Sequence, residues 1–129
     1  ESDVHIHRTL AQIKDKGIKA GLAVNPQTAV ESFRYLTDYM DMALVMTVSP
    51  GFAGQKIFAG AERKTNDTRE LLNELGCTEI PIEVDGNISL ENGRKLSKCG
   101  ADIFVLGTSG LFVKDKSIKQ ASEDFRKVL

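Results

Sequence analysis

Two carboxylates near the middle of the chain are the residues best placed for chemistry. Glu83 and Asp85 alternate with Ile82 and Val84 in a short β-branched run, and Gly86 follows. Because side chains alternate along a strand, both acids point to one face and the apolar pair to the other. Asp85 is the last residue of the run and would lie at the edge of the sheet, where the loops begin. We therefore expect this acid to carry the chemistry.

Three turns that follow expected strands are built from glycine and small polar residues. Turns of this kind can present backbone N–H groups and hydroxyls at helix N-termini, which suits a phosphate dianion. One such turn is ordinary turn chemistry, whereas three at one rim are a stronger signal. Asp85 would then lie one strand-end from the phosphate, placed to act on the carbon chain of a sugar phosphate. The residues of these turns are Gly51, Phe52, Ala53 and Gly54; Gly86 and Asn87; and Gly107, Thr108 and Ser109.

Strand and helix patterns alternate along the chain after an opening helix. Each β-rich run predicts a strand and is followed by a segment that predicts a helix. Thr28 and Ser89 are the expected caps of two of these helices. No hairpin signal separates the strands, so we expect a parallel sheet and the α/β class. The strands are expected at 18–24, 41–48, 80–85 and 102–107, and the helices at 4–16, 28–37, 62–75, 89–99 and 117–129.

The strand-helix units suggest the second half of a TIM (β/α)8 barrel, with a small open sheet as the alternative. Acids that face inward favour the barrel, whose interior can hold polar groups near one mouth. Residues 1–129 would be the C-terminal half of a single barrel domain, with no second domain. Glu1 in place of a starting methionine suggests a piece of a longer protein. In such a barrel, all loops that follow strands emerge at the face that carries active sites.

The composition fits one globular domain. The chain has 129 residues, 41% of them hydrophobic, and a net charge of −1 without a basic block, which argues against a nucleic-acid partner. No apolar run reaches membrane-spanning length and no signal peptide is recognisable, so we expect a soluble, cytoplasmic protein without a membrane partner. Cys77 and Cys99 are too isolated for a disulfide framework or a thiolate metal site.

Four segments of the chain carry a resemblance to a known family. Together with His-Arg-Thr-Leu at 7–10 and Gly-Leu-Ala-Val-Asn-Pro at 21–26, they resemble the ribulose-phosphate 3-epimerase family over nearly the whole chain. The closing Gly-Thr-Ser-Gly-Leu-Phe is most similar to its D-allulose-6-phosphate 3-epimerase branch. The segments are Ala-Leu-Val-Met-Thr-Val-Ser-Pro-Gly-Phe-Ala-Gly-Gln at 43–55, Ile-Glu-Val-Asp-Gly at 82–86, Gly-Ala-Asp-Ile-Phe-Val at 100–105 and Gly-Thr-Ser-Gly-Leu-Phe at 107–112.

The resemblance implies a metal-dependent epimerisation at C3 of a phosphorylated ketose. The substrate would be D-allulose 6-phosphate, converted to D-fructose 6-phosphate, or D-ribulose 5-phosphate, converted to D-xylulose 5-phosphate. Two aspartates would exchange the C3 proton through an enediolate, which one divalent cation (Zn, Mn, Co, Fe or Mg) would stabilise. A homo-oligomer is expected.

The family's roles transfer to particular residues of this chain. Asp85 would be one of the two acid–base aspartates and a metal ligand, and Met46 an apolar cap beside the reacting carbon. Ala53 and Asn87 stand where ribulose-phosphate enzymes usually have glycine. The substrate and phosphate loops would consist of Gly51, Phe52, Ala53 and Gly54, then Gly86 and Asn87, then Gly107, Thr108 and Ser109.

The resemblance also implies that part of the catalytic machinery lies elsewhere. In the family the second aspartate, two metal-binding histidines and a substrate-binding serine belong to strands upstream of Glu1. These 129 residues alone are therefore expected to lack a complete metal site and to be inactive. Two other functions remain open: a non-catalytic phosphate-binding half-barrel that assembles with a copy of itself, and another barrel enzyme such as a decarboxylase or synthase.

Several charged residues have simpler interpretations. His5 and His7, two positions apart on a helix, would face different sides and are interpreted as surface residues. Lys56 is interpreted as an exposed residue rather than a phosphate ligand. Glu83, one layer below Asp85 inside the barrel, needs a partner, and we expect a buried ion pair with Lys19.

Overall fold

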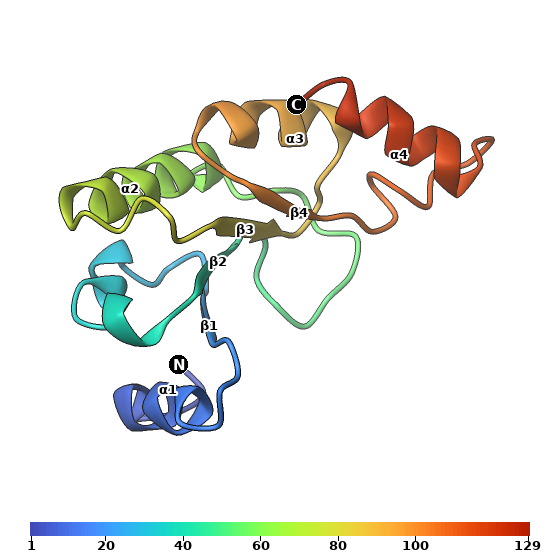
Figure 1. Ribbon diagram of the computed structural model, residues 1–129. Helices are drawn as coiled ribbons and strands as arrows, with labels where there is room; N and C mark the ends of the chain where they lie inside the picture. The colour runs from blue at the N-terminus through green and yellow to red at the C-terminus, as the bar shows by residue number, and fades with distance from the viewer.

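The computed structural model describes residues 1–129 as a parallel sheet with the later helices together on one side and the N-terminal helix apart from them, beside the first strand (Figure 1). The sheet has four strands in the order β1-β2-β3-β4, all parallel. This regular alternation confirms the predicted α/β class and is consistent with half of a (β/α)8 barrel. The strands are β1 (Gly21–Val24), β2 (Met42–Met46), β3 (Ile82–Asp85) and β4 (Ile103–Val105).

Each strand is shorter than its sequence pattern predicts, because only paired residues belong to a sheet. The ladder between β1 and β2 begins with Gly21 opposite Met42, so Ile18 and Lys19 have no strand residue beside them. The ladder between β3 and β4 likewise begins with Glu83 opposite Ile103. Hydrophobic patterning therefore located the strands but not their ends.

Four of the five predicted α-helices are present, and two of them, α3 and α4, begin with a side-chain cap. Ser89 begins α3 by accepting a hydrogen bond from the Asn92 N–H at 3.2 Å. Ser117 begins α4 with a capping box shared with Gln120. None of the helices is long and apolar enough to cross a bilayer. Their bounds are α1 (Ile6–Lys14), α2 (Ala61–Glu74), α3 (Leu90–Lys98) and α4 (Ile118–Arg126).

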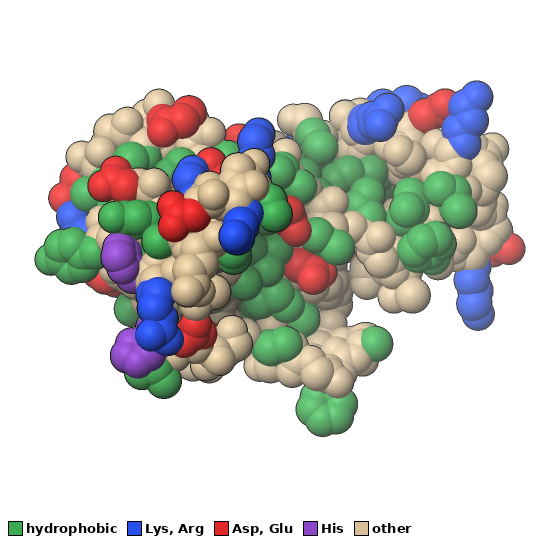
Figure 2. Space-filling model, turned by 60° about the horizontal axis from the view of Figure 1, so that its bottom comes forward, with side chains coloured by type: hydrophobic (Ala, Val, Ile, Leu, Met, Phe, Trp, Pro, Cys, Tyr) green, Lys and Arg blue, Asp and Glu red, His purple; other side chains and the backbone are tan.

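The two faces of the sheet have different surroundings. One face carries the buried side chains of β1, β2 and β3, which pack against α2, α3 and the segment between β1 and β2. The opposite face carries Glu83 and Asp85 and is only partly covered. Figure 2 shows a hollowed surface in which hydrophobic side chains gather with acidic ones beside them. The buried strand residues are Leu22, Val24, Ala43, Val45, Ile82 and Val84.

The α-helix predicted at residues 28–37 is wrong. Two 3₁₀ segments stand there instead, η1 (Val30–Phe33) and η2 (Thr37–Tyr39), and Thr28 does not cap either of them. A 3₁₀ helix has three residues per turn, so Val30 and Phe33, at the two ends of η1, both point toward the core. Phe33 is completely buried as a result.

The predicted ion pair between Lys19 and Glu83 is also absent from the structure. None of the ion pairs in the chain joins these two residues. The register explains this: Glu83 lies opposite Leu44, which lies opposite Ala23, whereas Lys19 precedes the strand altogether. Glu83 remains partly exposed on the open face of the sheet and does not need a buried partner.

Candidate active site

A hollow of about 460 Å³ lies at the carboxyl ends of β2, β3 and β4. Every residue predicted for the site from the sequence lines it, although these residues come from three separate loops. The position agrees with the rule that parallel strands deliver functional groups at their carboxyl ends. Its predicted members are Met46, Gly51, Phe52, Ala53, Gly54, Asp85, Gly86, Asn87, Gly107, Thr108 and Ser109.

Asp85 is the only charged residue that lines this hollow. It lies in one row of the sheet between Met46 of β2 and Val105 of β4. Its carboxylate forms no hydrogen bond or ion pair with another residue of the chain. The acid is therefore free to act on a ligand, and its immediate neighbours in the row are apolar.

Thr47 fixes the backbone at the end of β3. Its N–H donates to the Asp85 carbonyl at 2.8 Å. Its Oγ1 lies 2.9 Å from the Asp85 carbonyl and 2.6 Å from the Gly86 carbonyl. Thr47 is fully buried, so this contact holds the ends of β2 and β3 together beneath the carboxylate. Sequence reasoning missed Thr47, although a hydroxyl directly after a strand in a site loop was the available signal.

The loops around the hollow offer unpaired backbone donors. No N–H group of residues 51–54, 86–88 or 107–109 donates to another group of the chain. Unpaired N–H groups that converge on a concave surface favour an anion. These donors come from the three turns that the sequence predicted for phosphate.

Most of these donors do not lie at helix N-termini, and that part of the prediction is wrong. The helix after the first loop begins only at Ala61, and the helix after the third begins only at Ile118. In the third loop, the N–H groups of Leu111 and Phe112 donate to the Gly107 carbonyl and close a tight turn instead. Only the second turn leads directly into a helix, through the Ser89 cap of α3.

Glycine is needed at the second turn. Gly86 has φ +121, and a Cβ placed there would lie 2.5 Å from the Val48 side chain. Asn87 follows with φ +51, which asparagine tolerates better than most residues. The backbone therefore bends sharply immediately after Asp85, leaving the carboxylate at the rim.

The residues interpreted as peripheral lie away from the hollow. Lys56 follows the first loop but does not line the hollow and is exposed. His5 and His7 lie on the molecular surface, as Figure 2 shows in purple. His7 packs edge-on against Tyr39, with ring centroids 4.4 Å apart.

A divalent cation would find one ligand here. No cluster of three or more His, Cys, Asp or Glu side chains occurs in the chain. Protein sites for divalent cations generally draw on several side chains or carbonyls, and Asp85 supplies a single carboxylate. The residues present therefore do not form a coordination sphere by themselves.

Comparison with known proteins identifies the family. A profile of the Ribulose-phosphate 3 epimerase family matches residues 1–112, which include β1 to β4 and Asp85. The chain belongs to the ribulose-phosphate 3-epimerase family. The region of this epimerase-family chain that forms the hollow thus lies within the matched residues.

Individual relatives agree with the family assignment. The chain is 35% identical over 126 residues to the ribulose-phosphate 3-epimerase of Bacillus subtilis, covering 98% of this chain and 57% of the relative. It is 39% identical over 129 residues to that of Buchnera aphidicola from Acyrthosiphon pisum, covering 100% and 55%. It is 38% identical over 115 residues to the chloroplastic ribulose-5-phosphate-3-epimerase of Arabidopsis thaliana, covering 89% and 41%. This epimerase-family chain therefore spans about half the length of the relatives that it matches.

Proposed function

We propose that this chain is the C-terminal half of a ketose-phosphate 3-epimerase and supplies one of its two proton-transferring carboxylates. The observation that carries the proposal is the position of Asp85, an unpaired acid in a hollow whose loops offer unpaired backbone N–H groups. Membership of the ribulose-phosphate 3-epimerase family supports the same reaction class.

The proposed roles follow from the chemistry of the groups. The N–H groups of the loops bind the substrate phosphate, which orients the sugar along the row of Met46, Asp85 and Val105. Asp85 then takes or returns the proton at C3, a step that a positioned carboxylate accelerates. Met46 borders the reacting carbon and keeps water from it.

The rest of the machinery is proposed to lie outside these residues. The family resemblance assigns the second aspartate and the ligands of a divalent cation to strands that precede residue 1. The relatives match over about half their length, which leaves room in them for such strands. The activity therefore belongs to a protein that contains both halves.

The substrate is proposed to be D-ribulose 5-phosphate or D-allulose 6-phosphate. The named relatives favour the pentose, whereas the Gly-Thr-Ser-Gly-Leu-Phe segment at 107–112 resembles the branch that acts on the hexose. A coupled assay with each sugar phosphate, on a gene product that contains residues 1–129 and the upstream half, distinguishes the two.

The role of Asp85 is tested by isotope exchange in that same protein. The Asp85→Asn variant keeps the size of the side chain and should lose exchange of the C3 proton with solvent deuterium. Phosphate binding should remain nearly intact, because the loop N–H groups are unchanged. Exchange at the normal rate would show that another group carries the proton.

A non-catalytic phosphate-binding half-barrel is the second candidate. The open face of the sheet favours it, since Ile103 and Val105 of β4 are each 39% exposed and offer an apolar surface for a second copy of the chain to pack against. It predicts that the natural protein binds inorganic phosphate, self-associates and shows no exchange at C3. Exchange activity in the natural protein would exclude it.

A further inference from the structure

Asn87 reaches across the hollow to a different loop. Its Nδ2 donates a hydrogen bond to the backbone carbonyl of Gln55 at 2.5 Å, although the two residues lie in different loops. Asn87 is itself held in place, because its own carbonyl accepts from Asn92 Nδ2 at 2.8 Å on α3. The turn after β3 is thereby joined to the loop after β2.

Gln55 in turn closes the loop on which it lies. Its Nε2 donates to the carbonyl of Ser49 at 2.6 Å and to the carbonyl of Phe52 at 2.8 Å. Residues 49–55 are therefore held as one unit by the side chain of Gln55. The backbone carbonyl of the same residue accepts the hydrogen bond from Asn87.

The bond from Asn87 is the only hydrogen bond between residues 49–56 and the rest of the chain. Gly51, Phe52, Ala53 and Gly54 are all exposed, so packing adds little to hold the loop. The next tie along the chain is the Phe58 N–H, which donates to the Thr47 carbonyl at 3.0 Å. A single side chain thus connects this loop to the turn that follows Asp85.

We propose that Asn87 is a positioning residue that fastens the 49–55 loop to the β3 turn and so keeps two sets of anion-binding N–H groups at a fixed separation. The fastening follows from the structure alone. Its effect on anion affinity rests on the proposed function, and inorganic phosphate is the probe for that part.

The variant Asn87→Gly removes the donor and suits the backbone, because glycine adopts φ +51 freely. Asp115→Gly is the matched control. Asp115 is the other non-glycine residue with a positive φ, at 64, and it is exposed and does not line the hollow. Both variants make the same kind of backbone change, but only one removes the cross-loop hydrogen bond.

Lys56 provides a local readout, because trypsin cleaves after lysine and this residue directly follows the 49–55 loop. Loss of one hydrogen bond should speed cleavage at Lys56 by about five-fold in Asn87→Gly, with no change in Asp115→Gly. Asn87→Asp should behave like the glycine variant, because an ionised carboxylate cannot donate to the Gln55 carbonyl. Chemical denaturation should give both glycine variants similar global stability, since a general loss of structure would speed cleavage at every site.

Titration with inorganic phosphate completes the test in the same proteins. Asn87→Gly should bind several-fold more weakly than the natural chain, and Asp115→Gly should bind equally well. Unchanged cleavage at Lys56, or faster cleavage with unchanged phosphate affinity, would overturn the positioning role. If the natural chain does not bind phosphate, the proposed function loses its support, while the cleavage comparison still decides whether Asn87 fastens the loop.

Discussion

Asp41 and Asp102 occupy equivalent places at the beginnings of β2 and β4. Each carboxylate accepts a backbone N–H from the neighbouring strand region, from Ala20 to Asp41 and from Ile82 to Asp102, both at 2.8 Å. Each is also paired with a basic residue of an earlier helix. Lys14 of α1 lies 2.8 Å from Asp41, and Arg69 of α2 lies 2.5 Å from Asp102. The same pair of contacts thus joins a helix to the sheet at two places, both at the end of the sheet opposite the hollow.

The Asp102→Asn substitution should lower the free energy of unfolding by about 2 kcal/mol, because hydrogen bonds to a charged group are stronger than neutral ones. The Arg69 side chain is only 18% exposed, so it loses a partner that solvent replaces poorly. Urea unfolding measures the change. Glu91→Gln, which breaks the exposed pair with Lys95, is the control and should cost under about 0.5 kcal/mol. Equal losses in both variants would contradict the structural role of Asp102.

Asp41 should make stability depend on pH in the acid range. The hydrogen bond from Lys14, and then that from the Ala20 N–H, lower the pKa of this carboxyl below its ordinary value. A carboxyl whose pKa is lower when folded stabilises the protein above its unfolded pKa and loses that effect as the pH falls through the folded pKa. Below about pH 4, the natural chain should therefore lose stability more steeply than Asp41→Asn. Parallel curves for the two proteins, measured by urea unfolding from pH 2 to 6, would count against this contact.

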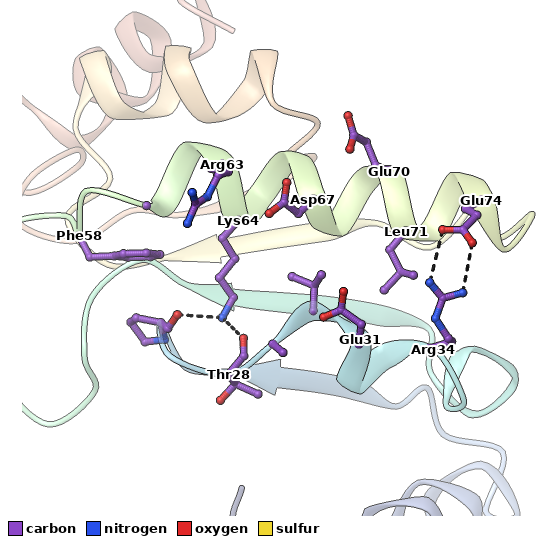
Figure 3. Close-up of a pocket in the computed structure, with 14 residues that line it drawn as sticks. Thr28, Glu31, Arg34, Phe58, Arg63, Lys64, Asp67, Glu70, Leu71 and Glu74 are labelled. Carbon is purple, nitrogen blue, oxygen red and sulfur yellow. Dashed lines mark hydrogen bonds and ion pairs between the residues drawn. The ribbon is translucent and has the colours of Figure 1, made fainter.

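Lys64 should stabilise the fold because its ammonium group donates hydrogen bonds to the turn that follows β1. Its Nζ donates to the carbonyls of Asn25, Pro26 and Thr28, at 3.3 Å for Pro26 and 2.6 Å for Thr28 (Figure 3). Its side chain is buried on α2, and burial lowers the pKa of the amine.

The Lys64→Met substitution keeps the length of the side chain but leaves these carbonyls without a donor. We expect a loss of about 2 to 4 kcal/mol in urea unfolding. Arg63→Met, one position earlier and exposed, is the matched control and should change stability by less than about 0.5 kcal/mol. A Lys64→Met protein as stable as the natural chain would show that water replaces the ammonium group.

Gly93 should resist replacement by alanine although it lies within α3. A Cβ at this position would come within 2.4 Å of the Phe125 ring on α4. Alanine improves helix propensity by about 1 kcal/mol, but displacement of the ring should cost about 1 to 3 kcal/mol, so we expect a net loss of stability. Ser97→Ala on the same helix is the control for propensity. Thermal unfolding that shows a gain for Gly93→Ala would mean that the ring moves aside freely.

Local sequence patterns predicted most of the elements and the composition of the rim. The alternation of Glu83 and Asp85 with Ile82 and Val84 correctly placed the acids on the face opposite the buried core. Ser89 was recognisable as a helix cap because its hydrogen bond spans only three residues. Features of this kind depend on neighbours in the sequence and can be recognised without a structure.

The errors arose where distant contacts decide the outcome. Thr28 has the residue type of a helix cap, yet its hydroxyl donates to the Glu1 carboxylate instead, and 3₁₀ turns follow. Lys19 and Glu83 have the right parity for a shared face, but Lys19 lies before β1, whereas Glu83 stands in the row of Leu44 and Ala23.

The sequence by itself predicted the residues that line the hollow and most of the elements that present them, because turn chemistry and strand alternation are local properties of the chain. Only the tertiary structure decided that Asn87 donates a hydrogen bond to the Gln55 carbonyl and that Thr47 donates one to the Asp85 carbonyl at the end of β3. Those contacts join residues more than thirty positions apart through a backbone carbonyl, a group that every residue possesses. No pattern of residue types can single out one carbonyl among so many, and only the packing of adjacent strands brings donor and acceptor together.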